Sequence, residues 1–244
     1  MTPNEARTEI SDLAIAMLRS GIAATVNTPI ITSKGSFKRI TWPAAASIEQ
    51  GLFSALPFAT ITEYRRMILE NQFVALLRDG ALLQLSMDIR ANSLTGHRFG
   101  FYPCPILVPD GFNVLDFEGL DLMLMDELGY CIQAVGGDSE PRIDQLRMRS
   151  PLRFDYAPDA ASASEPASHV HILNSDARIA VQGPLCLGHF IQFIFKHFYP
   201  KDWNDESLEY VTRWPIRDMD RTISLEEEST LHFNFRRAII VTLL

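Results

Sequence analysis

The spacing of apolar and polar residues predicts both helices and antiparallel strands in this chain. Residues 4–18 repeat apolar side chains at helical intervals and are followed by Gly21, which favours a helix that ends there. Residues 47–56 and 60–71 predict two short helices, because each begins at Ser or Thr and has Gln or Glu three residues later. Residues 184–199 begin at a proline suited to a first turn and are apolar almost all round, which predicts a long buried helix.

Strand signals dominate from residue 73 onward. Residues 73–78 and 81–89 flank an Asp-Gly pair, which predicts a β-hairpin, and residues 97–102 predict a third strand. Residues 120–129 are apolar and acidic without a clear period, so both a strand and a helix remain open. Residues 146–156 alternate strictly, which predicts a strand with an apolar face and a face of three arginines and an aspartate.

Together these elements predict one α+β domain over residues 1–244. We expect an antiparallel sheet covered by one long buried helix, residues 184–199, with the N-terminal helices at the edge. Residues 1–71 would form a helical N-terminal portion. Residues 72–244 would hold the sheet, with a closing strand over residues 230–244.

Composition and charge narrow the class of protein. Of the 244 residues, 47% are hydrophobic and 21% are charged, which is typical of a globular protein with a substantial core. The 22 basic and 30 acidic side chains give a net charge of −8, which excludes an overall basic footprint for nucleic acid. Ten of the acidic side chains lie within residues 71–140, against three basic ones.

The cysteines and the apolar runs predict a cytoplasmic protein with no membrane partner. Cys104, Cys131 and Cys186 form no CxxC pair, which argues against a disulfide framework or a cysteine zinc site. The polar first ten residues are unlike a signal peptide, and no run approaches the roughly 18 apolar residues of a membrane helix.

The candidate chemistry lies in residues 167–182. His169 and His171 are two residues apart, so on a strand both side chains point to the same face. A continuous apolar face on the other side requires an odd-sum register, and we expect His171 opposite Ala180 with Arg178 on the histidine face. The opposite, buried face would hold Val170, Ile172, Ile179 and Val181.

If the strand over residues 146–156 lies beside this hairpin, Arg153 and Asp155 join the histidines. In one chemistry, a histidine takes a proton from a hydroxyl and the other protonates the leaving oxygen, while arginines neutralise a phosphoryl group. RNA cleavage by its own 2′-hydroxyl needs only these parts. In another, His169, His171 and Asp155 bind one divalent metal that activates water. The candidate catalytic residues are His169, His171, Arg153, Asp155 and Arg178, with either no cofactor or one divalent metal.

Ordinary structural roles compete with these hypotheses. A His-x-His pair on a strand also occurs as a plain polar sheet face, and Asp155 beside Arg153 also forms a simple ion pair. His189 and His197 lie on the long apolar helix, where hydrogen-bonded core histidines are expected.

Four sequence fragments carry a resemblance to known proteins. RFDYAP, PASHVHI, ARIAVQGPL and HFIQFIFKHFYP resemble the bacterial domain-of-unknown-function 2290 family, over residues 152–203. A more distant similarity is to the TumE-like toxins of toxin–antitoxin pairs, although the chain is longer and lacks their third histidine. The matching positions are Arg153, Asp155, Pro166, His169 and His171. These resemblances imply a prokaryotic cytosolic protein from a mobile element, a toxin–antitoxin pair or phage defence.

The leading functional hypothesis is a toxin- or phage-defence-type protein that acts on nucleic acid, with RNA cleavage as the reaction. Its partners would be RNA and a protein such as an antitoxin or a defence-system subunit. The alternative is a non-catalytic interaction subunit that binds a partner protein through its acidic surface, and a third is a structural domain that needs an oligomer. A concave basic pocket at the histidine face would favour the enzyme, and a flat or filled face the interaction subunit.

Overall fold

An antiparallel sheet runs through the centre of the molecule. The computed structural model describes residues 1–43, 61–134, 151–162, 166–172, 178–220 and 222, and within them the sheet has nine strands. The strands are β1 (Ala23–Val26), β2 (Ile30–Lys34), β3 (Phe37–Thr41), β4 (Ala75–Leu77), β5 (Leu82–Arg90), β6 (Ser93–Tyr102), β7 (Leu152–Tyr156), β8 (Ser168–Ile172) and β9 (Ile179–Ala180). The helices are α1 (Pro3–Arg19), α2 (Ile61–Leu69), α3 (Phe117–Ala134), α4 (Leu187–Phe198), α5 (Pro200–Trp203) and α6 (Glu209–Thr212). Short 3₁₀ turns, η2 (Pro158–Ala160) and η3 (Glu206–Leu208), complete the described elements.

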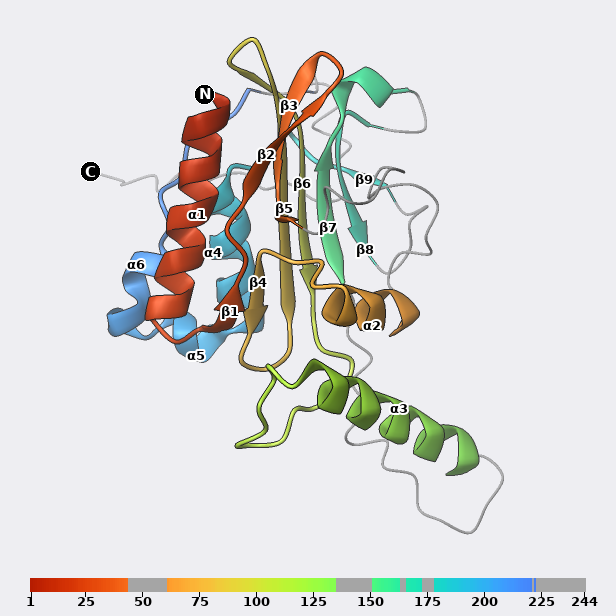
Figure 1. Cartoon of the computed structure of the whole chain (residues 1–244). Coiled ribbons are helices and arrows are strands. Elements are labelled where there is room, and N and C mark those ends of the chain that lie inside the picture. The colour runs from red at the N-terminus through yellow and green to blue at the C-terminus, as the bar shows by residue number, and fades with distance from the viewer. Residues whose placement is uncertain (44–60, 135–150, 163–165, 173–177, 221, 223–244) are drawn as a thin grey trace, which may run out of the picture.

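The strand order places β5 and β6 at the centre of the sheet (Figure 1). On one side the order continues through β7 and β8 to β9. On the other side, β4 and β3 pair with successive parts of the same edge of β5, and β1 and β2 follow them outward. Every pairing is antiparallel, which confirms the predicted α+β class with an antiparallel sheet.

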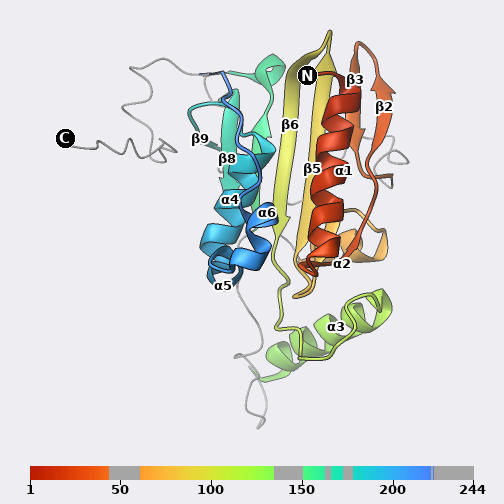
Figure 2. The ribbon, with the colours of Figure 1, turned by 90° about the vertical axis from the view of Figure 1, so that its left-hand side faces the viewer.

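One face of the sheet is apolar and packs against α1 and α4, which lie on the same side of it (Figure 2). A row of side chains crosses the strands on this face, from Leu85 through Phe99 and Phe154 to Val170, and each is at most 2% exposed. The Phe190 ring of α4 lies 5.5 Å from that of Phe99. This face is therefore the main core of the protein.

The first helix follows the pattern that its sequence predicts. Thr2 and Glu5 form a reciprocal capping box at its start, which satisfies two backbone N–H groups. Gly21 follows its end at φ +75°, a conformation that glycine adopts at little cost. Leu18, expected on the apolar face, is 44% exposed, because the helix turns it away from the sheet. The buried face consists of Ala6, Ile10, Leu13, Ala14 and Met17.

A second, smaller core lies between α2, α3 and one end of the sheet. The stretch over residues 120–129 proves to be helical, and Leu120 and Leu124, four residues apart, are buried in this core. Arg65 of α2 and Asp121 of α3 form a two-pronged ion pair. None of the described helices is both long enough and apolar enough to cross a membrane.

The predicted hairpin and third strand are confirmed as β4, β5 and β6, and residues 60–71 as α2. Strands β1, β2 and β3 were not predicted, and because of them residues 1–71 are not an entirely helical portion. The signal for β2 and β3 is the β-branched run around a Lys-Gly-Ser turn between residues 30 and 41. The helix expected over 47–56, the strand over 230–244 and the first part of the strand over 146–156 lie outside the described residues.

Helix α4 departs from the prediction in two respects. It begins at Leu187 rather than in a turn containing Pro184, because Cys186 is the residue that caps it, its sulfur accepting the His189 N–H. It also buries one face instead of all its surface, since Lys196 and His197 are exposed and Phe198 is 41% exposed. The buried face consists of Leu187, Gly188, Phe190, Ile191, Ile194 and Phe195.

Truncation of the two faces of α4 should separate core from surface. We expect Phe190→Ala and Ile194→Ala each to lower the free energy of unfolding by roughly 2–5 kcal/mol, because both side chains are fully buried. Phe198→Ala removes the same ring from an exposed position of the same helix and should cost clearly less. Denaturant unfolding of the three variants measures this, and equal losses for Phe190→Ala and Phe198→Ala would contradict the packing described.

Candidate functional site

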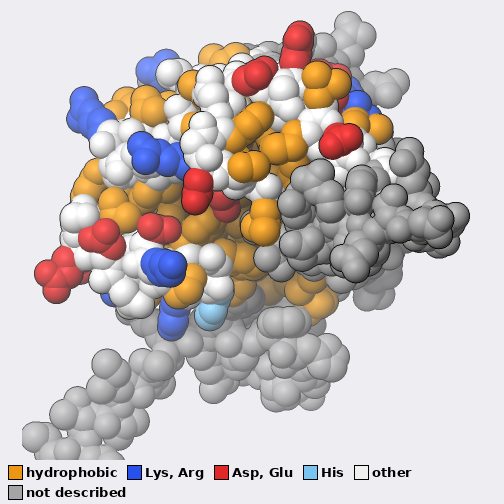
Figure 3. Space-filling view, turned by 90° about the horizontal axis from the view of Figure 1, so that it is seen from below, with side chains coloured by type: hydrophobic (Ala, Val, Ile, Leu, Met, Phe, Trp, Pro, Cys, Tyr) orange, Lys and Arg blue, Asp and Glu red, His pale blue; other side chains and the backbone are white. Residues whose placement is uncertain are grey.

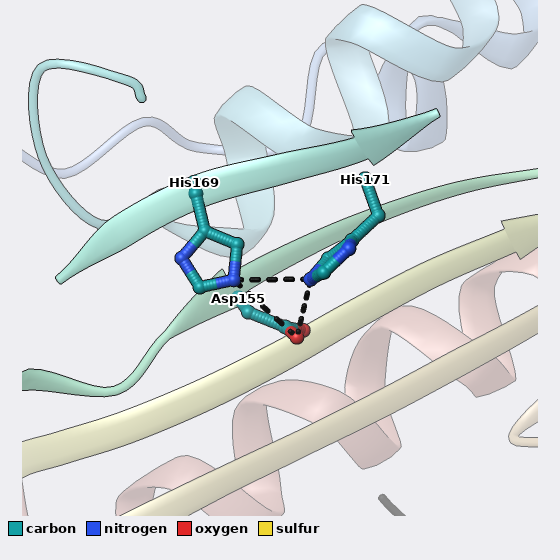
Figure 4. Close-up of side chains that lie close together, drawn as sticks. All are labelled: Asp155, His169 and His171. Atoms are coloured by element: carbon teal, nitrogen blue, oxygen red, sulfur yellow. Dashed lines mark hydrogen bonds and ion pairs between the residues drawn. The ribbon is translucent and has the colours of Figure 1, made fainter. Parts of the chain in front are cut away.

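Three neighbouring strands bring polar side chains together on the sheet face that points away from α1 and α4. Arg98 of β6 is level with Asp155 of β7, which is level with His169 of β8. Two residues before Asp155 in β7, Arg153 is level with His171. Figure 4 shows Asp155, His169 and His171 converging from β7 and β8. We refer to these three residues as the Asp–His–His cluster.

The cluster is a small triangle of potential ligand atoms. His169 Nε2 lies 3.0 Å from His171 Nε2. His171 Nε2 lies 3.4 Å from Asp155 Oδ2, and His169 Nε2 lies 4.0 Å from the same oxygen. Divalent transition metals bind imidazole nitrogens and carboxylate oxygens. The three ligand atoms of the cluster lie close enough together to bind one such ion.

A backbone contact fixes the state of one imidazole ring. His169 Nδ1 lies 2.6 Å from the carbonyl oxygen of Pro166, which only accepts hydrogen bonds. The ring therefore carries a proton on Nδ1 and, when neutral, presents the lone pair of Nε2 to the cluster. His171 Nε2 then donates toward the acceptors in front of it.

Two arginines compensate the charge of the buried carboxylate. Arg98 Nε donates to Asp155 Oδ1 at 3.1 Å, and Arg153 Nε donates to Oδ2 at 3.0 Å. Burial by itself would raise the pKa of Asp155, but Arg98, the hydrogen bond from His171 and Arg153 hold it well below its usual range. Burial in turn lowers the pKa of Arg98 to about 10, against the attraction of Asp155. Both groups remain charged at neutral pH.

A cavity of about 140 Å³ reaches the cluster from the side of β3, β5 and β6. The imidazoles of His169 and His171 are only 2% and 1% exposed. His169 lines the cavity, whereas His171 lies behind it in the cluster and is not part of the lining. Across it, Arg39 and Asp88 form a two-pronged ion pair with N–O distances of 2.7 and 2.6 Å. The face is hollowed, but its charge is balanced rather than basic. The lining consists of Arg39, Ser86, Asp88, His97, Arg98, Asp155, Tyr156, Ala157 and His169.

The structure brings together four of the five predicted site residues, because β7 lies beside β8. The predicted register between β8 and β9 was wrong by two residues, since Ala180 lies opposite His169 rather than His171. A shift of two keeps every side chain on its predicted face, so the alternation that suggested the register could not detect the error. Arg178 precedes β9, is half-buried and, by extension of this register, is level with His171.

The two faces of this hairpin do not follow a simple inside–outside pattern. Val170 and Val181 are buried as expected, whereas Ile172 and Ile179 are only half-buried. The histidines, predicted on the opposite face, lie there and are nevertheless buried.

Sequence reasoning missed Arg98, which is as close to Asp155 as Arg153 is. Its signal is that Arg98 is the single Arg, Lys, Asp or Glu residue of β6. The neighbouring His97 points to the core face, where its Nε2 accepts the Leu185 N–H at 3.0 Å and its ring stacks on Phe99. Burial lowers the pKa of His97 to about 4, so this histidine is neutral and structural.

The remaining described histidines lie away from the cluster, on α4. His189 is half-buried, and its Nδ1 lies 3.5 Å from Cys186 Sγ. Burial raises the pKa of the Cys186 thiol, but hydrogen bonds from His189 and from the Arg217 backbone outweigh it and lower the pKa overall. His197 is exposed, so the expected core role was wrong for this residue, because it lies on the outer face of the helix.

A larger groove of about 1070 Å³ opens on the underside of the molecule (Figure 3). Its apolar floor includes Phe101, Leu152 and Phe198, and acidic side chains such as Asp202 and Asp205 line its rim. It contains no member of the Asp–His–His cluster and belongs to the apolar face of the sheet.

Replacement of Asp155 should reveal the charge compensation. Because Asp155→Asn removes the buried carboxylate charge that Arg98 and Arg153 contact, we expect a loss of roughly 3–5 kcal/mol in the free energy of unfolding at pH 7. The depressed pKa means that this stabilisation is present above the unfolded-state pKa of about 3.9 and is lost as the pH falls toward the folded-state pKa. The difference between parent and variant should therefore stay constant from about pH 7 to 5 and shrink below about pH 4.

The matched control is Asp159→Asn, because Asp159 pairs with Arg90 at an exposed site. That variant should change stability by less than about 1 kcal/mol at any pH. Urea unfolding between pH 3 and 7 measures both, and a pH-independent difference for Asp155→Asn would rule out the described compensation.

Comparison with known proteins places the chain in a family. No curated protein and no solved structure matches it significantly. A family model described as an uncharacterized conserved protein, DUF2290, matches residues 22–235, which includes every residue of the site. The chain therefore belongs to the DUF2290 family.

Proposed function

We propose that this protein is a prokaryotic toxin- or phage-defence-type protein that cleaves RNA at the Asp–His–His cluster. The observation that carries the proposal is the meeting of Asp155, His169 and His171 with two arginines beside a cavity. Buried ionisable groups that converge on a cavity are a common mark of a catalytic site.

The charges around the cluster suit an anionic substrate. Asp155 contributes one negative charge, whereas Arg98 and Arg153 together contribute two positive charges. Guanidinium groups in a site that is largely shielded from water favour a phosphoryl group as it develops charge during reaction.

The reaction breaks a P–O bond of the RNA backbone. In the metal-free form, the 2′-oxygen attacks phosphorus, a histidine accepts its proton, and the 5′-oxygen leaves with a proton from an acid. The products are a 2′,3′-cyclic phosphate and a 5′-hydroxyl. In the metal-assisted form, a water-derived hydroxide attacks phosphorus, and the leaving oxygen takes up a proton.

The dimensions of the cavity limit what reaches the cluster. A volume of about 140 Å³ holds roughly four or five water molecules, which is enough for a phosphate group but not for a whole nucleotide. The substrate would therefore present its backbone to the cavity with the bases outside it. Single-stranded RNA meets this requirement more easily than a stacked duplex.

A second candidate function, the interaction subunit, has an observation of its own. Helix α3 carries Leu122 at 69% exposure and Met125 at 42%. Exposed acidic residues, Glu118 and Asp126, lie on the same helix, which has no Lys or Arg. An exposed apolar strip with acidic neighbours suits a partner protein with an apolar and basic surface.

Substitution of the histidines tests the proposed RNA cleavage. We expect His169→Asn and His171→Asn each to lower the cleavage rate of a labelled single-stranded RNA by at least about a hundredfold, since general acid–base and metal-ligand roles both need the imidazole. Asparagine is chosen because alanine would leave a cavity at these buried positions. His197→Asn, on the exposed face of α4, is the control and should keep the parent rate. A folded double variant that still cleaves RNA at the parent rate would overturn the proposal.

A cell-based assay separates the two candidate functions. If the protein acts as an interaction subunit, Leu122→Asp should abolish its biological effect, because a charge replaces an apolar side chain of α3 that is 69% exposed. The histidine variants should then retain the effect. The reverse pattern, loss with the histidine variants and retention with Leu122→Asp, favours RNA cleavage.

A further inference from the structure

The distances within the Asp–His–His cluster distinguish between the metal-free and the metal-assisted form of the reaction. An in-line displacement at phosphorus has its attacking and leaving oxygens on opposite sides of the phosphoryl group. A pair of histidines that serves both oxygens must hold that group between them. His169 Nε2 and His171 Nε2 are 3.0 Å apart, which is a direct hydrogen-bond distance that leaves no room for it.

The same distances are close to those of a metal-bound set. Ligand atoms at 2.0–2.2 Å from a tetrahedral ion lie about 3.3–3.6 Å from one another. The three sides of the cluster are 3.0, 3.4 and 4.0 Å, so shifts of roughly half an ångström bring all three atoms onto one ion. Side-chain rotations at these positions are sufficient for such shifts.

The surroundings of the ligand atoms also match a metal site. A metal-bound histidine usually donates its other ring N–H to a carbonyl or a carboxylate, and His169 Nδ1 does so to Pro166. A metal-bound carboxylate is usually hydrogen-bonded as well, and Asp155 accepts from Arg98 and Arg153. These contacts hold both side chains in orientation before an ion arrives.

We propose that Asp155, His169 and His171 bind one divalent first-row transition metal of the zinc class, with its remaining coordination positions directed to the cavity. Two nitrogens and one oxygen favour such an ion over Mg²⁺ or Ca²⁺, which prefer sets of oxygen ligands. The cavity of about 140 Å³ reaches Asp155 and His169 and has room for water or a phosphate oxygen on the ion. The two arginines add positive charge beside it, so an anion is the preferred extra ligand.

This metal site does not depend on RNA being the substrate. Zinc binding without RNA cleavage supports the site and overturns the proposed function. RNA cleavage that persists in a chelator, by a chain that binds no zinc, overturns the site and leaves the proposed function standing.

The test is titration of the full-length, metal-stripped chain with Zn²⁺, and separately with Mg²⁺, followed by calorimetry and by metal analysis after gel filtration. We expect one equivalent of zinc, no comparable magnesium binding, and a higher Tm in the presence of zinc. His169→Gln and His171→Gln should each weaken zinc binding by more than about a hundredfold. Replacing a residue that only hydrogen-bonds to a metal ligand typically weakens binding by about 10- to 100-fold. His189→Gln, beside Cys186 on α4, is the control and should bind zinc like the parent.

A measurement on the parent chain covers the case in which the glutamine variants do not fold. The chain loaded with one equivalent of Co²⁺ should show visible absorption bands of a four- or five-coordinate ion without a thiolate charge-transfer band, because the cluster contains no sulfur. No stoichiometric binding, a thiolate band, or full zinc affinity in both folded glutamine variants would each overturn the proposal.

Discussion

The negative charge of Asp155 is buried among three strands, and the arrangement of the polar sheet face follows from its compensation. A carboxylate that is 7% exposed requires opposite charge and hydrogen bonds within the protein. Arg98 supplies them from β6, and Arg153 supplies them from within β7. Arg98 reaches Asp155 only because β6 lies beside β7. A slip of one residue in the pairing of these strands would turn Asp155 toward the apolar core.

The histidines approach Asp155 from β8, at the carboxylate oxygen Oδ2 that also accepts from Arg153. Their positions are supported from behind by the apolar row that includes Phe154 and Val170, which packs on the sheet face covered by α1 and α4. Strands therefore carry all three ligand residues, and the segment before β8 contributes the Pro166 carbonyl that orients His169. The buried polar face is tolerated because most of its charges are paired.

Much of this arrangement was predictable from local pattern. Alternation in the strand around Arg153 and Asp155 and in the strand around His169 and His171 showed which side chains share a face. The Asp-Gly turn between β4 and β5 identified a hairpin directly. The fragments that resemble the family lie around β7, β8, β9 and α4, and the family model extends the match to residues 22–235.

The features that were missed depend on contacts between distant parts of the chain. Arg98 joins the site only because β6 pairs with β7, more than 50 residues later, and no local pattern encodes that pairing. The two-residue register error at β9 preserved the faces, so only backbone pairing reveals it. Helix α4 looked apolar all round, yet its packing against one sheet face leaves Phe198 at 41% exposure.

The most direct test of the account is a crystal structure of the zinc-loaded protein, with anomalous diffraction recorded on both sides of the zinc edge. The account predicts one strong anomalous peak about 2.0–2.2 Å from Asp155 Oδ2 and from Nε2 of His169 and His171. Arg98 and Arg153 should still donate to Asp155. A zinc ion bound elsewhere, with the two histidines still in direct hydrogen-bond contact, would contradict it.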